Sequence, residues 1–118
     1  MSGQRDFVLR WIEEIVRTVH RMLFGPGPVD VAAAEARVAD AIAQLLGPLT
    51  LLVPRLDVPS AADLLGDGDR ITSLAELLDL QAAVEEAGGK TDQARLTRER
   101  AAAFREEAGR RDPRAGER

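Results

Sequence analysis

Hydrophobic and polar side chains separate most clearly in residues 6–24, DFVLRWIEEIVRTVHRMLF. On a helix with about 100° per residue, the apolar side chains fill one arc of about 200° and the charged side chains fill the opposite arc. Asp6 stands at the position of an N-cap, and Gly25 follows the last apolar residue as a helix stop. The pattern therefore predicts a strongly amphipathic helix over residues 6–24.

A second helix is predicted over residues 30–46. The preceding residues 25–29 begin with Gly-Pro-Gly-Pro, which cannot continue a helix, so we expect a linker there. Asp30 can cap the second helix, and Gly47 followed by Pro48 ends it. Because its polar residues are few, this helix is expected to pack on more than one side.

Residues 48–60 form an apolar run that three prolines interrupt. Prolines break regular helix, so we interpret this run as a buried connector with one helical turn at most. A short helix over residues 60–65 is predicted to follow, because Ser60 and Asp63 have nearly the spacing of a capping box.

The last two helices are predicted over residues 70–87 and 91–108, separated by two glycines. Ser73 and Glu76 have capping-box spacing near the start of the first, and Thr91 is the expected N-cap of the second. The second helix carries a seam at spacings of three and four, which suits the close approach of another helix. The seam consists of Ala94, Thr97, Ala101, Phe104 and Ala108.

Composition agrees with an all-α fold. Ala, Leu, Glu and Arg dominate, aromatic residues make up 3%, and β-branched residues never cluster as a strand requires. A chain of 118 residues is long enough for one domain with its own core. We expect a single all-α domain over residues 1–108, with four main helices, one short helix and an antiparallel C-terminal hairpin.

Charge is distributed unevenly along the chain, whose net charge is −4. Residues 1–89 carry 7 basic and 14 acidic side chains, whereas residues 90–118 carry 9 basic and 6 acidic ones. Residues 109–118, GRRDPRAGER, are predicted to form a disordered basic tail. Such a tail can contact nucleic acid, but no aromatic side chain interleaves its arginines to stack on bases.

The stretch GDGDRITSLAEL, residues 66–77, resembles a calcium-binding loop at first sight. Such a loop needs a bidentate glutamate at its twelfth position. The two possible registers place Leu74 or Ala75 there, so the cation would be under-coordinated. We therefore predict a helix start in this stretch.

No arrangement of residues predicts catalysis. His20 is the only histidine, and Glu13 and Glu14 are adjacent, so they point about 100° apart on a helix. The chain has no cysteine, which excludes thiolate nucleophiles and thiolate metal sites. We expect no enzyme, cofactor, metal or small-molecule substrate. The charged N-terminal segment and the absence of cysteine favour a cytoplasmic location.

Residues 75–108 resemble one helical hairpin of the tetratricopeptide type. The small residues Ala82, Gly89, Ala94 and Ala101 match its spacing of 7, 5 and 7, although Arg98 stands where a large apolar residue belongs and the closing proline is missing. The layout that begins with DFVLRWIEE is also similar to a small bacterial family of unknown function. This resemblance implies a fold but no activity.

Three hypotheses about function remain. The first is a protein-interaction or oligomerisation module, most simply a homodimer, that uses the apolar face of residues 6–24 unless later helices cover it. The second is docking of the same helix on a membrane surface. The third, which the single lysine Lys90 disfavours, is nucleic-acid binding through the C-terminal region. The face consists of Phe7, Val8, Trp11, Ile12, Ile15, Val19, Met22 and Leu23.

Overall fold

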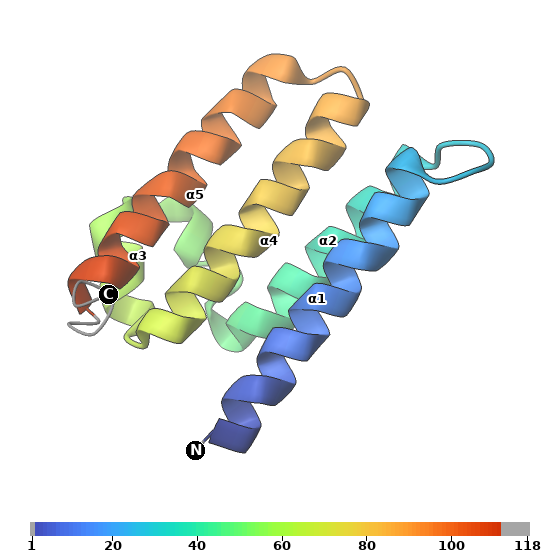
Figure 1. Cartoon of the computed structure of the whole chain (residues 1–118). Coiled ribbons are helices and arrows are strands. Elements are labelled where there is room, and N and C mark those ends of the chain that lie inside the picture. Colours follow the sequence, from blue (N-terminus) through green and yellow to red (C-terminus); the bar gives the residue numbers. More distant parts are fainter. Residues whose placement is uncertain (1, 112–118) are drawn as a thin grey trace.

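Five α-helices make up the domain in the computed structural model, which describes residues 2–111 and contains no strand within them (Figure 1). They are α1 (Ser2–Phe24), α2 (Val31–Leu46), α3 (Val58–Leu65), α4 (Gly68–Ala87) and α5 (Thr91–Arg111). Two single turns of 3-10 helix, Gly47–Leu49 and Val53–Arg55, lie between α2 and α3. The all-α prediction is confirmed.

Helix α4 lies at the centre of the arrangement. The antiparallel pair α1 and α2 packs on one side of α4, and α5 packs along its other side (Figure 1). The short α3 packs on α5 and α4. The predicted pairing of the last two helices is confirmed, since α4 and α5 run antiparallel in close contact (Figure 1).

The buried side chains form two clusters that meet along α4. The first cluster joins the end of α2, the connector, α3, the first half of α4 and the second half of α5; it consists of Leu46, Val53, Ala61, Ala62, Leu65, Ile71, Leu74, Ala75, Ala101, Phe104 and Ala108. The second joins α1, α2 and the second half of α4; it consists of Ile15, Val19, Leu23, Ala34, Val38, Ala41, Leu77, Leu80 and Val84. Ile42 and Leu45 of α2 pack against both clusters, so the two are connected.

Aspartates cap the starts of three helices. Asp30, Asp57 and Asp67 each accept a hydrogen bond of 2.9–3.2 Å from a backbone N–H of the first turn of α2, α3 and α4. Such caps satisfy donors that the helix itself leaves open. The predicted cap of α2 is confirmed, and residues 66–77 do contain a helix start.

Four predicted helix starts need correction. Helix α5 begins at Thr91, so Lys90 rather than Thr91 stands at its N-cap position. Helix α3 is capped by Asp57 rather than Ser60, whose hydroxyl donates to Asp57 Oδ1 at 2.8 Å from inside the helix. Helix α4 begins at Gly68, so Ser73 is buried within the helix and the predicted capping box with Glu76 is wrong. Helix α1 begins at Ser2, which places the predicted cap Asp6 inside it. Neighbouring residues compete for the N-cap position, and Asp57 and Asp67 occupy it in α3 and α4.

The connector between α2 and α3 is less buried than predicted. Val53 is 3% exposed, but Leu51 is 81% and Leu52 is 45% exposed. The prolines confine the chain to two separate 3-10 turns, and a single turn can direct only part of its side chains toward the core. The expectation of a buried connector therefore holds for Val53 alone among these three.

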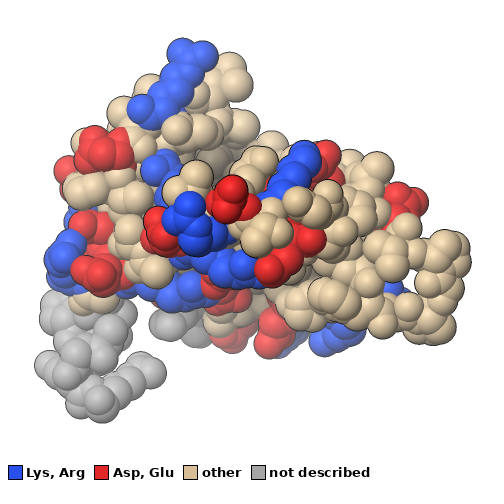
Figure 2. All heavy atoms as spheres, turned by 90° about the horizontal axis from the view of Figure 1, so that it is seen from above, with Lys and Arg blue, Asp and Glu red and all other residues tan. Residues whose placement is uncertain are grey.

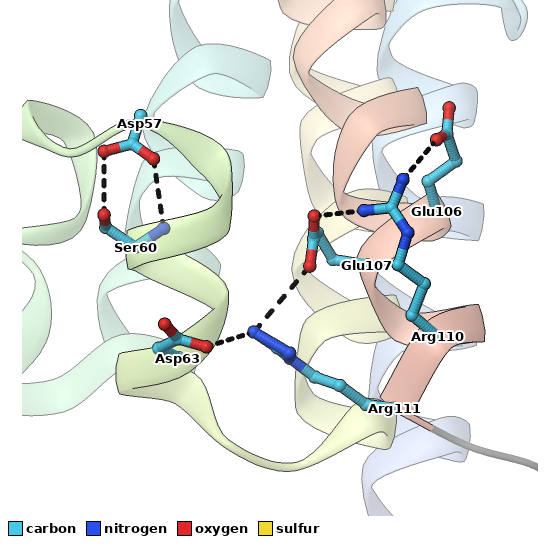
Figure 3. Close-up of polar contacts among 7 residues, drawn as sticks. All are labelled: Asp57, Ser60, Asp63, Glu106, Glu107, Arg110 and Arg111. Atoms are coloured by element: carbon cyan, nitrogen blue, oxygen red, sulfur yellow. Dashed lines mark hydrogen bonds and ion pairs between the residues drawn. The ribbon is translucent and has the colours of Figure 1, made fainter.

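One ion pair joins the end of α5 to α3, and three more lie within the last turns of α5 (Figure 3). Arg111 pairs with Asp63 of α3 and with Glu107 on its own helix. Arg110 pairs with Glu106 at 3.1 Å and also with Glu107. These contacts favour the helical conformation in the last turn.

The predicted disordered tail, residues 109–118, is therefore partly wrong. Residues 109–111 continue α5. Residues 112–118 lie outside the described part of the chain.

Candidate functional site

The structure divides the predicted interaction face of α1 into two parts. The first part packs against α2 and α4 inside the chain, where it is almost completely buried. It consists of Ile12 (1% exposed), Ile15 (5%), Val19 (0%) and Leu23 (4%). These side chains are covered within one chain, so they cannot form a surface between chains unless α1 leaves its place.

The second part of the α1 face remains accessible. Phe7 is 71% exposed, and Val8, Trp11 and Met22 are partly buried. The N-terminal turns of α1 extend beyond the neighbouring end of α2 (Figure 1). What remains of the predicted face is therefore the end of α1 near Phe7.

A groove between α2 and α5 is a feature that the sequence did not predict. Its floor is α4, and it consists of two adjoining hollows of about 310 and 210 Å³ that share Gln81. The wide hollow is lined by Ile42, Leu46, Val53, Pro54, Leu74, Leu78, Gln81, Thr97, Arg100 and Phe104. The narrow hollow is lined by Glu35, Val38, Ala39, Gln81, Val84, Glu85 and Gln93. We call the whole the α2–α5 groove.

The wide hollow is apolar except at its rim. Arg100 lies over the ring of Phe104, with the guanidinium carbon 5.1 Å from the ring centroid. Its Nη2 donates to the carbonyl oxygens of Val53 at 3.0 Å and Leu56 at 3.1 Å, which fixes the connector as the end wall. Burial of the guanidinium lowers the pKa of Arg100, which Asp57 partly offsets.

The narrow hollow is polar and acidic. Glu85 is only 5% exposed, and its carboxylate accepts hydrogen bonds from Thr97 Oγ1 at 2.8 Å and Gln81 Nε2 at 3.0 Å. Within residues 6–111, no cationic side chain lies within ion-pair distance of this carboxylate. Glu35 adds a second carboxylate to the lining.

The α4–α5 turn brings these polar groups together. Gln81 and Glu85 are one turn apart on α4, and Thr97 faces them from α5. Gly89 adopts a positive φ of 83°, which lets the chain reverse directly after α4. The sequence offered one signal for this site, because Gln81 and Glu85 place polar side chains one turn apart among the mostly apolar buried positions of α4.

His20, the only histidine, takes no part in the groove. Its ring contacts Phe24 edge-on with centroids 5.8 Å apart. It lies in a separate shallow hollow of about 190 Å³ between α1, α4 and α5. Asp79, which also lines that hollow, pairs with Arg105 at 2.6 Å.

The basic side chains of α5 all have partners within the chain. Arg100 binds carbonyl oxygens, and the others pair with carboxylates: Arg95 with Glu99, Arg98 with Glu86, Arg105 with Asp79, Arg110 with Glu106 and Arg111 with Asp63. Figure 2 shows blue and red spheres interleaved over much of the visible face, whereas the edge formed by the α1–α2 turn is mostly tan. This mixture reduces the positive potential that nucleic-acid binding needs.

None of the helices in residues 2–111 combines the length and apolar character that crossing a membrane requires. Comparisons with models of protein families, with curated proteins and with solved structures found no match.

Proposed function

We propose that this chain is a non-enzymatic protein-interaction module that binds a polypeptide segment in the α2–α5 groove. The observation that carries this proposal is the groove itself, with an apolar hollow next to a polar one. Apolar side chains of a partner would gain burial against Ile42 and Leu78, which are partly exposed. The amide and carboxylate groups around Gln81 would bind the partner's polar atoms and set its register.

The α4–α5 pair supports the further proposal that the C-terminal half is built like a tetratricopeptide hairpin. Ala82, Ala94 and Ala101 are all fully buried, as close helix packing in such a hairpin requires. Gly89 lies in the turn with a positive φ. We likewise propose, from the sequence pattern alone, that the whole layout resembles a small bacterial family of unknown function.

The test is selection of binding peptides by the full chain from a displayed library of random peptides. Ala39 lines the groove and is exposed, so Ala39→Phe should fill the narrow hollow without disturbing the core. We expect the selected peptides to bind Ala39→Phe at least about tenfold more weakly than the unmodified chain, as loss of a buried contact costs on this scale. Fluorescence anisotropy with labelled peptides measures the difference.

Ala36→Phe is the matched control, because Ala36 is an exposed residue of the same helix outside the groove lining. It adds the same side chain and should leave peptide affinity unchanged. Equal weakening by both variants, or no peptide selected by the unmodified chain, would contradict the proposal.

Self-association is a second candidate, favoured by the exposed end of α1. Phe7 is 71% and Leu9 42% exposed there, next to the partly buried Trp11. Light scattering behind size exclusion should then give a dimer that Phe7→Asp dissociates while helicity is retained. A monomer at every concentration removes this candidate. Ile12→Asp is unsuitable for the test, because Ile12 is 1% exposed and its replacement would unfold the chain.

Docking on a membrane surface through α1 is the alternative that requires the largest rearrangement of the fold. It requires α1 to separate from α2 and α4, which would expose the side chains around Val19 in the second cluster. Binding to anionic lipid vesicles that Trp11→Glu abolishes would support it. Absence of binding by the intact chain would end it.

A further inference from the structure

We infer that the α2–α5 groove selects segments that carry a lysine or arginine, whose cationic end pairs with Glu85. This inference rests on the proposed function and names the chemistry of its partner. It starts from the carboxylate of Glu85, which lies in the lining of the narrow hollow although it is 5% exposed.

The hydrogen bonds of Glu85 are incomplete for a buried charge. An ionised carboxylate offers about four acceptor positions, and Thr97 and Gln81 occupy two of them. Both donors are neutral. A buried carboxylate is normally paired with a cation, because removal of the charge from water is otherwise costly. The described residues provide no such cation for Glu85.

The surroundings of Glu85 also favour a cation from outside. The narrow hollow is lined by two carboxylates and two amides, and by no basic side chain. Glu35 of this lining pairs with Lys90, whose Nζ lies 3.8 Å from Glu35 Oε2, and both side chains are more than half exposed. An exposed pair of this kind is weak and exchanges readily. The field in the hollow therefore attracts positive charge.

The apolar part of the same lining suits the stem of a long basic side chain. Val38, Ala39 and Val84 flank the carboxylate. Lysine and arginine pack their methylene groups on such surfaces while the charged end reaches a polar partner. Apolar neighbours of the basic residue would then enter the wide hollow beside Leu78 and Phe104.

Glu85 also ties α4 to α5 through Thr97, so a test must separate recognition from stability. Glu85→Gln keeps the size of the side chain, and its amide oxygen can still accept from Thr97. Its amide nitrogen can donate to the side-chain oxygen of Gln81 once the Gln81 amide rotates to exchange its oxygen and nitrogen. The charge alone is lost. Glu86→Gln is the matched control, because Glu86 is the exposed neighbour that pairs with Arg98 at 2.6 Å outside the groove.

The experiment uses peptides selected by the full chain from the random library described above. We expect the selected sequences to share a lysine or arginine next to apolar residues. Affinity for such a peptide should fall at least tenfold with Glu85→Gln and stay unchanged with Glu86→Gln. Replacement of the peptide's basic residue by methionine should weaken binding to the unmodified chain but have no further effect on Glu85→Gln.

Two other outcomes are distinguishable: one contradicts only the inference about Glu85, and the other contradicts the proposed function as well. If the selected peptides lose affinity for Ala39→Phe but show no basic residue and no sensitivity to Glu85→Gln, the inference about Glu85 fails and the groove remains a peptide site. If no peptide is selected, or Ala39→Phe has no effect, the proposed function fails together with the inference. Denaturation of Glu85→Gln, with a midpoint close to that of the unmodified chain, shows that lost affinity does not come from lost folding.

Discussion

At the scale of single residues, one arginine holds the end of α2 and another holds the connector between α2 and α3. Arg70 donates to the carbonyl oxygens of Leu45 at 3.2 Å and Leu46 at 3.1 Å, which the end of α2 leaves without helical partners. Arg100 does the same for two carbonyl oxygens farther along the connector. Segments rich in proline leave many carbonyls open, and the planar guanidinium can bind two of them at once.

Arg100→Met should destabilise the fold markedly. The change keeps much of the packing on Phe104 but removes the guanidinium donor from the carbonyls of Val53 and Leu56, and Val53 then keeps only the backbone N–H of Leu56 at 3.2 Å. We expect the free energy of unfolding in urea to fall by about 1–3 kcal/mol. Arg95→Met is the control, since Arg95 makes only an exposed pair with Glu99, and it should cost less than about 1 kcal/mol. Equal effects of the two changes would contradict the role of Arg100.

Asp57 makes the start of α3 sensitive to acid. The hydroxyl and the backbone N–H of Ser60 donate to its carboxylate and hold the pKa of Asp57 below its ordinary value. The stabilisation is therefore complete above the ordinary pKa of an aspartate and is lost as the pH falls through the lower pKa of the folded state. Asp57→Asn should abolish this part of the pH dependence while keeping a capping residue.

The measurement is urea denaturation from about pH 7 down to about pH 2. The unmodified chain should lose more stability than Asp57→Asn over the acidic part of this range. Parallel curves for the two proteins would show that the cap does not titrate as the hydrogen bonds imply.

At the scale of elements, α4 and α5 pack closely because small side chains lie between them. Ala82 on α4 and Ala94 and Ala101 on α5 are completely buried. Larger side chains at these positions would force the helix axes apart. The seam of α5 that the sequence predicted thus faces α4 and α3, as the burial of Phe104 and Ala108 in the first cluster shows.

Ala101→Leu should separate these helices and lower stability. Overpacking of a filled core costs about 1–3 kcal/mol, and Ala101 is completely buried between the helices. Ala102→Leu adds the same atoms to the exposed neighbour and should change stability by less than about 0.5 kcal/mol. Thermal unfolding followed by circular dichroism distinguishes the two variants. Destabilisation by Ala102→Leu as well would argue against this packing.

At the scale of the whole molecule, α4 makes the two hydrophobic clusters one folding unit. It supplies Ile71 and Leu74 to the first cluster and Leu77 and Leu80 to the second. Opening of either cluster removes the support of the other through this helix. The domain should therefore unfold in a single cooperative transition, as small domains usually do.

Trp11, the only tryptophan, reports whether α1 shares this transition. Its side chain packs against the second cluster, so undocking of α1 should change its fluorescence. We expect the fluorescence and circular dichroism transitions in urea to coincide. Leu77→Ala should move both midpoints together and lower stability by about 2–5 kcal/mol, because Leu77 is fully buried. A fluorescence transition at lower urea would mean that α1 leaves the domain by itself, as membrane docking would require.

Much of the secondary structure could be predicted because its signals are local. Gly25 ends α1 and Asp30 caps α2, and both features depend only on residues within one helical turn. The predictions for Ser60 and Ser73 were wrong because an aspartate several residues earlier provided a competing cap. Such competition is decided by which helix start fits the packing of the whole helix.

The candidate site could be predicted only in part. The sequence correctly marked one arc of α1 as apolar, but it could not tell that Val19 and its buried neighbours would be covered by α2 and α4. Periodicity shows which side chains need burial and not which element provides it. The groove escaped prediction entirely, since its lining combines residues more than fifty positions apart in the sequence, such as Glu35 on α2 and Gln93 on α5.

The sequence by itself thus determined the helical class, the order of the helices and the approximate ends of most of them, because capping, helix-breaking residues and apolar periodicity act within a few residues. The tertiary structure decided how much of the α1 face stays accessible, how α2 and α5 stand apart on α4, and that Glu85 lies buried with no cation from residues 6–111 paired to it. These features depend on the relative placement of helices, which many weak contacts between distant residues set together.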